Sequence, residues 1–184
     1  MHPKEQATID EIINFWFEET SVKQKFTKNE VFDALIKKRF EPVFWQIMQG
    51  ETESWRSTPE GKLAEVVVLD QFARNMFRGD KQSFAGDELA LALAKEAIET
   101  GADMTLPEDR RQAFYMPFMH SESKAVHEEA APLFTERASE SVKEYEQKHK
   151  AIIDQFGRYP HRNEILGRES TPDELIFLEE HSGF

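Results

Sequence analysis

Apolar residues recur along the chain at intervals of three and four positions, which is the spacing of one face of an α-helix. Capping boxes, in which a threonine hydroxyl and a glutamate three residues later satisfy free backbone amides, predict helix starts at Thr8 and Thr27. The apolar positions at helical spacing are Ile12, Ile13, Trp16 and Phe17 in the first helix and Val31, Phe32, Leu35, Ile36 and Phe40 in the second. The second helix is expected to bend near Pro42 and to end near Gly50.

Further helix signals follow along the rest of the chain. Thr58 and Thr171 each precede a proline, which is typical of an N-cap followed by Pro at the first helical position. Four further helices are predicted at 87–101, 107–118, 126–134 and 141–157. A short helix is predicted from His161 to Leu166.

These signals predict an all-α protein of seven to nine helices in antiparallel pairs, folded as one domain over residues 1–184. The alternating Leu-Ala run from Leu89 to Ala94 resembles a strand pattern, but it lacks β-branched residues and is rich in the best helix former. Either a helix bundle or a stack of tetratricopeptide-like helix pairs fits the helix lengths, and no clear 34-residue repeat is present.

The composition limits the kinds of partner and site that the protein can have. The formal net charge of −12 argues against a nucleic-acid or anionic-membrane binder, because both need a basic face. The chain has no cysteine, which excludes disulfides, thiolate zinc sites and a cysteine nucleophile. The sequence shows neither a signal peptide nor an apolar run long enough to span a membrane, so we expect a cytoplasmic protein.

One polar cluster lies on the helix that follows Thr58. Asp70, Arg74 and Arg78 share one stripe of the helix surface with Gln71 and Asn75. An exposed stripe more often holds Lys and Glu. This pattern is typical of the lip of a pocket. The structural alternative is a solvated face with an (i, i+4) ion pair between Asp70 and Arg74.

Two further clusters are rich in groups that bind anions or move protons. The first runs from Tyr115 to Glu122 and contains His120, for which a hydrogen-bonded structural role is the simpler explanation. The second runs from Phe156 to Arg168, where arginines can bind a carboxylate or phosphate through two N–H groups or stack on Tyr159. The structural alternative is a lock in which these arginines pair with carboxylates such as Asp70, Glu122 or Glu164.

The motifs in these clusters also resemble those of a widespread, mostly bacterial family, domain of unknown function 924. The matching stretches are Ile13–Phe17, Thr58–Gly61, Leu69–Gly79, Tyr115–Glu122, Phe156–Asn163 and Gly167–Thr171, and the similarity covers nearly the whole chain. Where the family often has proline, this chain has Ala73. The resemblance implies an all-α fold of paired helices similar to tetratricopeptide repeats, and it implies no activity, cofactor or catalytic residue.

The leading hypothesis is a site for a small anionic molecule, with a histidine available for proton transfer. The predicted ligand-binding residues are Asp70, Gln71, Arg74, Asn75, Arg78, Tyr115, His120, Arg158, His161, Arg162, Asn163 and Arg168. We expect no metal, because a di-metal helix bundle would need Glu-x-x-His motifs on two helices plus further glutamates, and the His-Glu-x-x-His motif is absent. No cofactor fingerprint is present. The alternatives are a tetratricopeptide-like groove that clamps an acidic peptide or a carboxylate terminus, and a purely structural lock.

Overall fold

The computed structural model describes residues 2–180, and within this range every regular element is a helix. The prediction of an all-α class is therefore confirmed, whereas the tetratricopeptide-like pairing stays a prediction. The α-helices of the described range are α1 (Pro3–Asn14), α2 (Val22–Phe26), α3 (Glu30–Met48), α4 (Pro59–Val66), α5 (Ala73–Met76), α6 (Asp87–Glu99), α7 (Glu108–Arg111), α8 (Met116–Met119), α9 (Lys124–Arg137), α10 (Glu140–Phe156) and α11 (Pro172–Glu180). None of the helices between residues 2 and 180 is long and apolar enough to cross a membrane.

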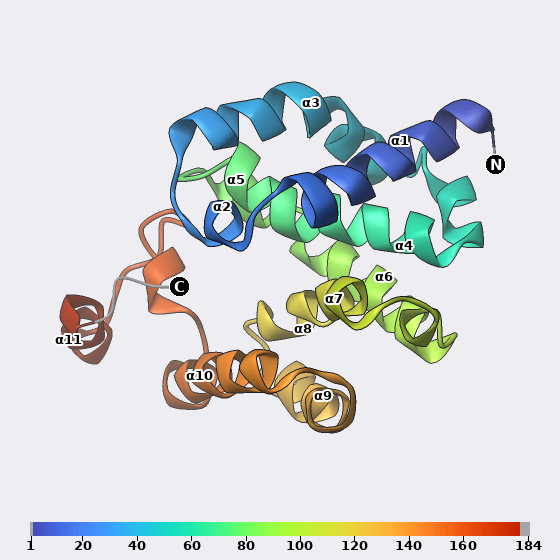
Figure 1. The fold of residues 1–184 in the computed structure, drawn as a ribbon. Helices are drawn as coiled ribbons and strands as arrows, with labels where there is room; N and C mark the ends of the chain where they lie inside the picture. The colour runs from blue at the N-terminus through green and yellow to red at the C-terminus, as the bar shows by residue number, and fades with distance from the viewer. Residues whose placement is uncertain (1, 181–184) are drawn as a thin grey trace. The chain divides into compact units, whose positions relative to one another are not determined.

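The chain divides into two compact units. Unit 1 comprises Met1–Arg78 and Gln82–Pro117, and unit 2 comprises Gly79–Lys81 and Phe118–Phe184. In unit 1, α4 lies beside α1 and α6, and α5 lies beside α3 (Figure 1). In unit 2, α9 packs against α10, and α11 packs against the short 3-10 helix Pro160–Arg162.

Two predicted helix starts were wrong. The first helix begins earlier than Thr8, because the His2 side chain accepts a hydrogen bond from the Lys4 amide and forms the capping box. The third helix is capped by Asn29, whose Oδ1 accepts from two backbone amides, and not by Thr27. Asparagine is at least as good an N-cap as threonine, so the two adjacent signals competed and the later one prevailed.

The helix predicted from Pro107 to Phe118 is divided into α7, a 3-10 helix and α8, and the helices predicted from Val126 and Ser141 begin at Lys124 and Glu140. Three other predicted boundaries agree with the structure. The Thr58 hydroxyl accepts from the Gly61 amide, the Thr171 hydroxyl accepts from the Glu174 amide, and α10 ends at Gly157 with a φ of 70°. The predicted bend at Pro42 does not end α3, which continues to Met48. A 3-10 helix, Pro160–Arg162, replaces the short α-helix predicted at 161–166.

The core of unit 1 contains two π-helical segments, Phe15–Glu19 and Val67–Phe72, which no periodic pattern predicted. Phe72 joins them, because its ring meets Phe15 at a centroid distance of 5.7 Å and Trp16 at 5.3 Å. Phe40 lies 4.7 Å from the same ring. π-helical turns are rare and often occur at functional sites. The segment Val67–Phe72 carries Asp70, the first residue of the predicted stripe.

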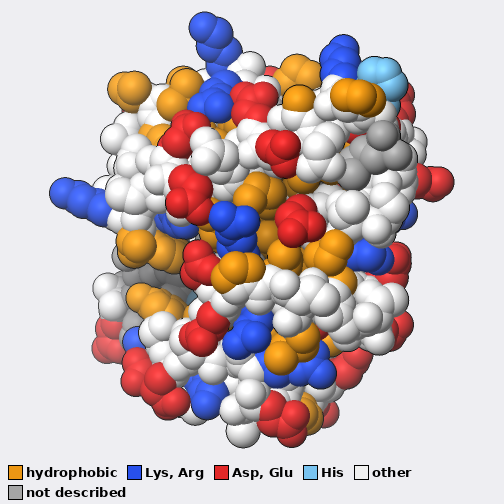
Figure 2. Space-filling model, turned by 45° about the vertical axis from the view of Figure 1, so that its right-hand side comes forward, with side chains coloured by type: hydrophobic (Ala, Val, Ile, Leu, Met, Phe, Trp, Pro, Cys, Tyr) orange, Lys and Arg blue, Asp and Glu red, His pale blue; other side chains and the backbone are white. Residues whose placement is uncertain are grey.

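Not every apolar position of the helical pattern is buried. Phe32, Ile36 and Phe40 of α3 face the core, whereas Val31 and Leu35 on the same helix are exposed. Trp45, near the end of the same helix, is also exposed. On the face shown in Figure 2, acidic and basic side chains are interspersed with apolar ones.

We expect Gly61→Ala to destabilise the protein although alanine is the better helix former. A Cβ atom at Gly61 would lie 2.0 Å from the Trp55 carbonyl oxygen, which belongs to the backbone and cannot rotate away. Overpacking of this kind costs about 1–3 kcal/mol, more than the roughly 1 kcal/mol gained in helix propensity. Thermal unfolding would measure the loss, and an unchanged or raised melting temperature would contradict the close packing of α4 against Trp55.

Candidate functional site

In unit 1, carboxylates hold the arginines of the predicted stripe. Arg74 donates two hydrogen bonds of 3.0 Å to the two oxygens of Asp87, and it forms the predicted (i, i+4) ion pair with Asp70 at 3.2 Å. Asp70 is fully buried and also accepts from the Gln71 amide group. The part of the stripe around the buried Asp70 is therefore a packed ionic network, whereas Arg78 at its end is exposed.

Asp33 of α3 holds the end of the stripe. Arg78 donates through Nε at 2.6 Å and through Nη2 at 3.1 Å to the Asp33 carboxylate, and Asn75 donates to the same group at 2.8 Å. Tyr115 lies elsewhere in the unit, where its buried hydroxyl donates to Asp103 at 2.9 Å. The sequence identified Asn75, Arg78 and Tyr115 but none of their acidic partners.

In unit 2, Glu174 of α11 accepts hydrogen bonds from three residues. Arg158 donates to both carboxylate oxygens at 2.6 and 2.7 Å, the Asn163 side chain donates at 3.2 Å, and the Thr171 amide donates at 2.8 Å. The Arg158 guanidinium is the main reason that the pKa of the Glu174 carboxyl falls to about 2, against the opposing effect of burial. Glu174 therefore stays charged at any physiological pH.

A second arginine-glutamate pair lies beside the first. Arg168 donates to both oxygens of Glu122 at 2.6 and 3.0 Å, and to the Asn163 Oδ1 at 2.9 Å. Burial opposes the charge on Glu122, but the Arg168 guanidinium and the Tyr159 amide outweigh it, so the pKa of Glu122 lies below its ordinary value. Because Asn163 bonds to a member of each pair, the two pairs form one hydrogen-bond network, which we call the arginine-glutamate lock.

Three histidines of unit 2 lie against the fully buried Tyr159, and a fourth, His120, lies beside one of them. The His149 ring lies 5.7 Å from the tyrosine ring in an edge-on arrangement, the His161 ring lies 5.5 Å away, and the His120 ring lies 6.1 Å from that of His149. His127 approaches the tyrosine hydroxyl at 3.4 Å. We call these five residues the histidine-tyrosine cluster.

Burial is the main cause that lowers the pKa of His149 to about 3, and the neighbouring His120 lowers it further. Its Nδ1 lies 2.7 Å from the Tyr145 carbonyl, so that nitrogen carries the proton of the neutral ring. At neutral pH, His149 therefore contributes an uncharged imidazole to the cluster.

His127 and Glu146 form a buried pair at 2.6 Å. The other ring nitrogen of His127 lies 2.9 Å from the Ser121 carbonyl, which only accepts, so that nitrogen must carry a proton. The short contact between Nδ1 and the carboxylate gives each of these two buried groups a polar partner.

Arg162 completes the cluster. It is buried, its guanidinium carbon lies 4.6 Å from the centre of the Tyr159 ring, and its Nη2 donates to the His120 carbonyl at 2.9 Å. The stacking of an arginine on Tyr159 agrees with the expectation from the sequence. A guanidinium on a tyrosine face retains its fork of N–H donors in the plane of the group.

The predicted site residues thus fall into two groups, one in each unit. Unit 1 holds Asp70, Gln71, Arg74, Asn75, Arg78 and Tyr115, and unit 2 holds His120, Arg158, His161, Arg162, Asn163 and Arg168. In unit 2, hydrogen bonds or ring contacts connect these residues. In unit 1 they fall into three sets: Asp70 bonds to Gln71 and Arg74, Asn75 and Arg78 share Asp33, and Tyr115 bonds to Asp103. That the two groups form one shared site stays a prediction.

Sequence reasoning missed His127, Glu146 and His149. A signal existed for two of them, because Glu146 and His149 precede Ile152 and Ile153 at intervals of three and four, which places them on the buried face of α10. Polar residues on such a face need polar partners. Among residues 2–180, no group of three or more His, Asp or Glu side chains has the arrangement of a metal site.

The comparisons with known proteins agree with the fold. Residues 12–182 match the model of a family described as bacterial protein of unknown function, DUF924. No curated protein matches the chain. A solved structure of a protein of unknown function, ATU0120 from Agrobacterium tumefaciens, is 37% identical, covers 96% of this chain and 99% of its own, and superposes with a TM-score of 0.89. The chain belongs to the DUF924 family.

Proposed function

We propose that the protein binds a small molecule bearing a carboxylate or phosphate, and that Arg162, His120 and His161 of unit 2 contact it. The observation that carries the proposal is the buried Arg162 guanidinium stacked on Tyr159 among imidazole rings. His120 and His161 are only partly buried, so they lie at the accessible edge of this group. Buried cationic groups surrounded by polar rings are costly to assemble, and such costs are typical of functional sites.

The other predicted arginines receive a different role in this proposal. The forks of Arg158 and Arg168 are each occupied by a glutamate, and those of Arg74 and Arg78 by aspartates. Carboxylates of the protein already satisfy these side chains, so a ligand would have to displace them. We therefore assign the lock to holding the turn at residues 158–163, which carries Arg162, in place.

The chemistry of the contacting groups suits a small anion. An arginine fork binds two oxygens of a carboxylate or phosphate, and hydrogen bonds to a charged group are worth about 1.5–3 kcal/mol each. Neutral imidazoles such as that of His149 add no competing charge. An imidazole beside a bound phosphate or carboxylate is also able to accept or donate a proton, which is the enzymatic form of the proposal.

We expect Arg162→Ala to weaken the binding of an anionic ligand by about 1.5–3 kcal/mol, roughly 10- to 150-fold, and Arg162→Lys to recover only part of that loss. Calorimetric titration and thermal melts with phosphate, pyrophosphate, citrate and acetate would measure this. Arg110→Ala is a matched control, because Arg110 pairs with Glu18 on the surface of unit 1. The affinity of the Arg110→Ala variant for the ligand should be unchanged.

Three outcomes separate the hypotheses. Stabilisation of the wild-type protein by an anion, lost in Arg162→Ala and kept in Arg110→Ala, supports the proposal. No stabilisation by any anion, together with a lower melting temperature of Arg162→Ala, favours the purely structural lock. Binding of acidic peptides but not of small anions favours the tetratricopeptide-like groove.

A further inference from the structure

The exposed apolar side chains of the protein gather in two segments of opposite charge. Nine large apolar side chains are exposed among the described residues, and six of them lie in these two segments. The first segment contributes Val22, Phe26, Val31 and Leu35, and the second contributes Leu175 and Ile176. Scattered apolar residues need no explanation, but a concentration of them marks an interaction surface.

The first segment is basic. Residues 21–38 contain five lysines against two acidic residues, a net charge of +3 in a chain whose net charge is −12. Val22 and Phe26 are four residues apart on α2, which buries none of its own residues, and Val31 and Leu35 are four residues apart on α3. Phe26 is 79% exposed. We call this segment the basic apolar surface.

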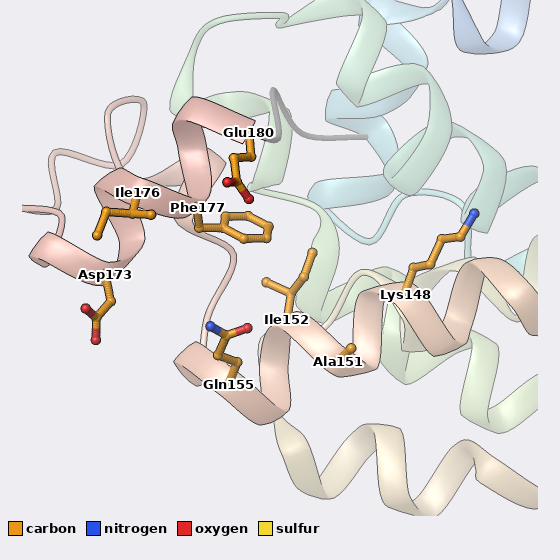
Figure 3. A pocket seen from close by; sticks show the side chains of 8 residues that line it. All are labelled: Lys148, Ala151, Ile152, Gln155, Asp173, Ile176, Phe177 and Glu180. Atoms are coloured by element: carbon orange, nitrogen blue, oxygen red, sulfur yellow. The ribbon is translucent and has the colours of Figure 1, made fainter.

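The second segment is acidic and borders a groove. α11 contains four acidic residues and no Lys or Arg, and three of the four remain exposed while Glu174 is buried against Arg158. Between α10 and α11 lies a groove of about 760 Å³. Figure 3 shows Ile152 of α10 and Phe177 of α11 facing it, with Asp173 and Glu180 at the two ends of α11.

We infer that the protein associates with a second copy of itself, through insertion of the basic apolar surface of one copy into the α10–α11 groove of the other. A short helix with apolar residues at i and i+4 is the kind of element that occupies an apolar groove between helices. The lysines beside Val22 and Phe26, which include Lys23 and Lys28, match in charge the acidic rim that Asp173 and Glu180 of α11 give the groove, whose α10 side carries Lys148. One chain supplies both complementary surfaces, so further copies satisfy both.

The contact joins two different surfaces and is therefore heterologous. Each copy gives its basic apolar surface to one neighbour and has its groove available for the basic apolar surface of another. The Phe26 ring is the central anchor of this contact, because aromatic residues are the usual hot spots of interfaces. Ile176, which is 60% exposed on the wall of the groove, is its counterpart.

The test is the oligomeric state of the full chain, measured by sedimentation velocity and light scattering from about 1 µM to 1 mM. Phe26→Asp and Ile176→Lys are each expected to weaken association by about 30-fold, the effect of removing a hot spot. Met104→Asp is the matched control, since Met104 is 51% exposed outside both surfaces and its replacement should leave association unchanged. Raising the salt concentration should weaken the wild-type association, because it screens the lysines and the acidic rim.

Mixing the two variants provides the sharpest readout. The Phe26→Asp copy keeps its groove and the Ile176→Lys copy keeps its basic apolar surface, so an equimolar mixture should associate when neither variant does alone. Both substitutions are on the surface, and melting temperatures and circular dichroism spectra like those of the wild type would establish that the variants fold.

Several results would overturn the inference. These are a wild-type protein that stays monomeric throughout the concentration range, an oligomer that both variants leave intact, and a mixture that fails to associate. Monomeric protein that binds phosphatidylserine vesicles through Phe26 would assign the surface to a membrane instead. A monomer that binds an apolar fluorescent probe, lost in Ile176→Lys alone, would assign the groove to a small ligand.

Discussion

Phe72→Ala is expected to lower the free energy of unfolding by about 4 kcal/mol and the melting temperature by roughly 8–16 °C. The Phe72 ring is fully buried and contacts the rings of Phe15, Trp16 and Phe40. Removing it leaves a cavity lined by rings from two separate elements, the π-helical segment Phe15–Glu19 and α3, and such a site collapses poorly. The contacts between the two π-helical segments are lost at the same time.

Trp fluorescence and far-ultraviolet circular dichroism together would measure this change. All three tryptophans, Trp16, Trp45 and Trp55, belong to unit 1, so fluorescence reports that unit while circular dichroism reports both. Phe26→Ala makes the same substitution at an exposed position and is expected to change stability by less than about 0.5 kcal/mol. Equal losses in the two variants would show that the aromatic cluster does not hold unit 1 together.

Glu174→Gln is expected to cost about 2–3 kcal/mol at neutral pH, because it leaves Arg158 without its charged partner in a largely buried setting. The effect should depend on pH. The folded pKa of Glu174 is about 2, below its ordinary value of 4.5, so its contribution to stability is complete above about pH 4.5 and disappears as the pH falls towards 2. The difference between wild type and variant should shrink over the same interval.

His149 adds a second loss on the acidic side. Its folded pKa of about 3 lies below the ordinary value of 6.5, so below pH 6.5 the unfolded chain takes up a proton that the folded chain does not. Stability therefore falls from about pH 6.5 in both wild type and Glu174→Gln. Only the part of the loss between pH 4.5 and 2 should distinguish the two proteins.

Urea unfolding at a series of pH values would check both effects by circular dichroism. Glu140→Gln is a suitable control in the same unit, because Glu140 pairs with Lys143 at 3.5 Å on the surface and should contribute little. A constant difference between wild type and Glu174→Gln from pH 7 to pH 2 would contradict the ionic character of the lock. An unfolding phase seen by circular dichroism but not by fluorescence would show that the units unfold separately.

The helical class was predictable because nearly every boundary carries a local signal. Gly157 takes a positive φ, and the hydroxyls of Thr58 and Thr171 cap their helices, all of which involve residues within a few positions. Competing local signals, as at Thr27 and Asn29, produced the errors at helix starts. The π-helical segments could not be predicted, because they depend on packing between residues that are far apart in the sequence, such as Phe15 and Phe72.

The site was only partly predictable for a related reason. Unusual density of arginine, histidine and asparagine drew attention to Arg158 and Arg162, but their partners come from far along the chain. Glu174 lies 16 residues after Arg158, and Glu122 lies 46 residues before Arg168. The sequence named Glu122 among the candidate partners, and the structure pairs it with Arg168, but nothing in the local sequence singled out Glu174.

The π-helical segment Val67–Phe72 gives this stretch one side chain more than an uninterrupted α-helix would carry over the same distance. A π turn holds one residue more than an α turn in the same place, so deleting a single residue here would let an ordinary α-helix run from Pro59 to the end of α5. Because the π turn absorbs the extra residue, Asn75 and Arg78 would still face Asp33 after the deletion. Within the π segment itself, the deletion would change which side chains occupy the positions of Asp70 and Phe72. Among relatives, this stretch should accordingly accept the loss of one residue without losing the hydrogen bonds at Asp33.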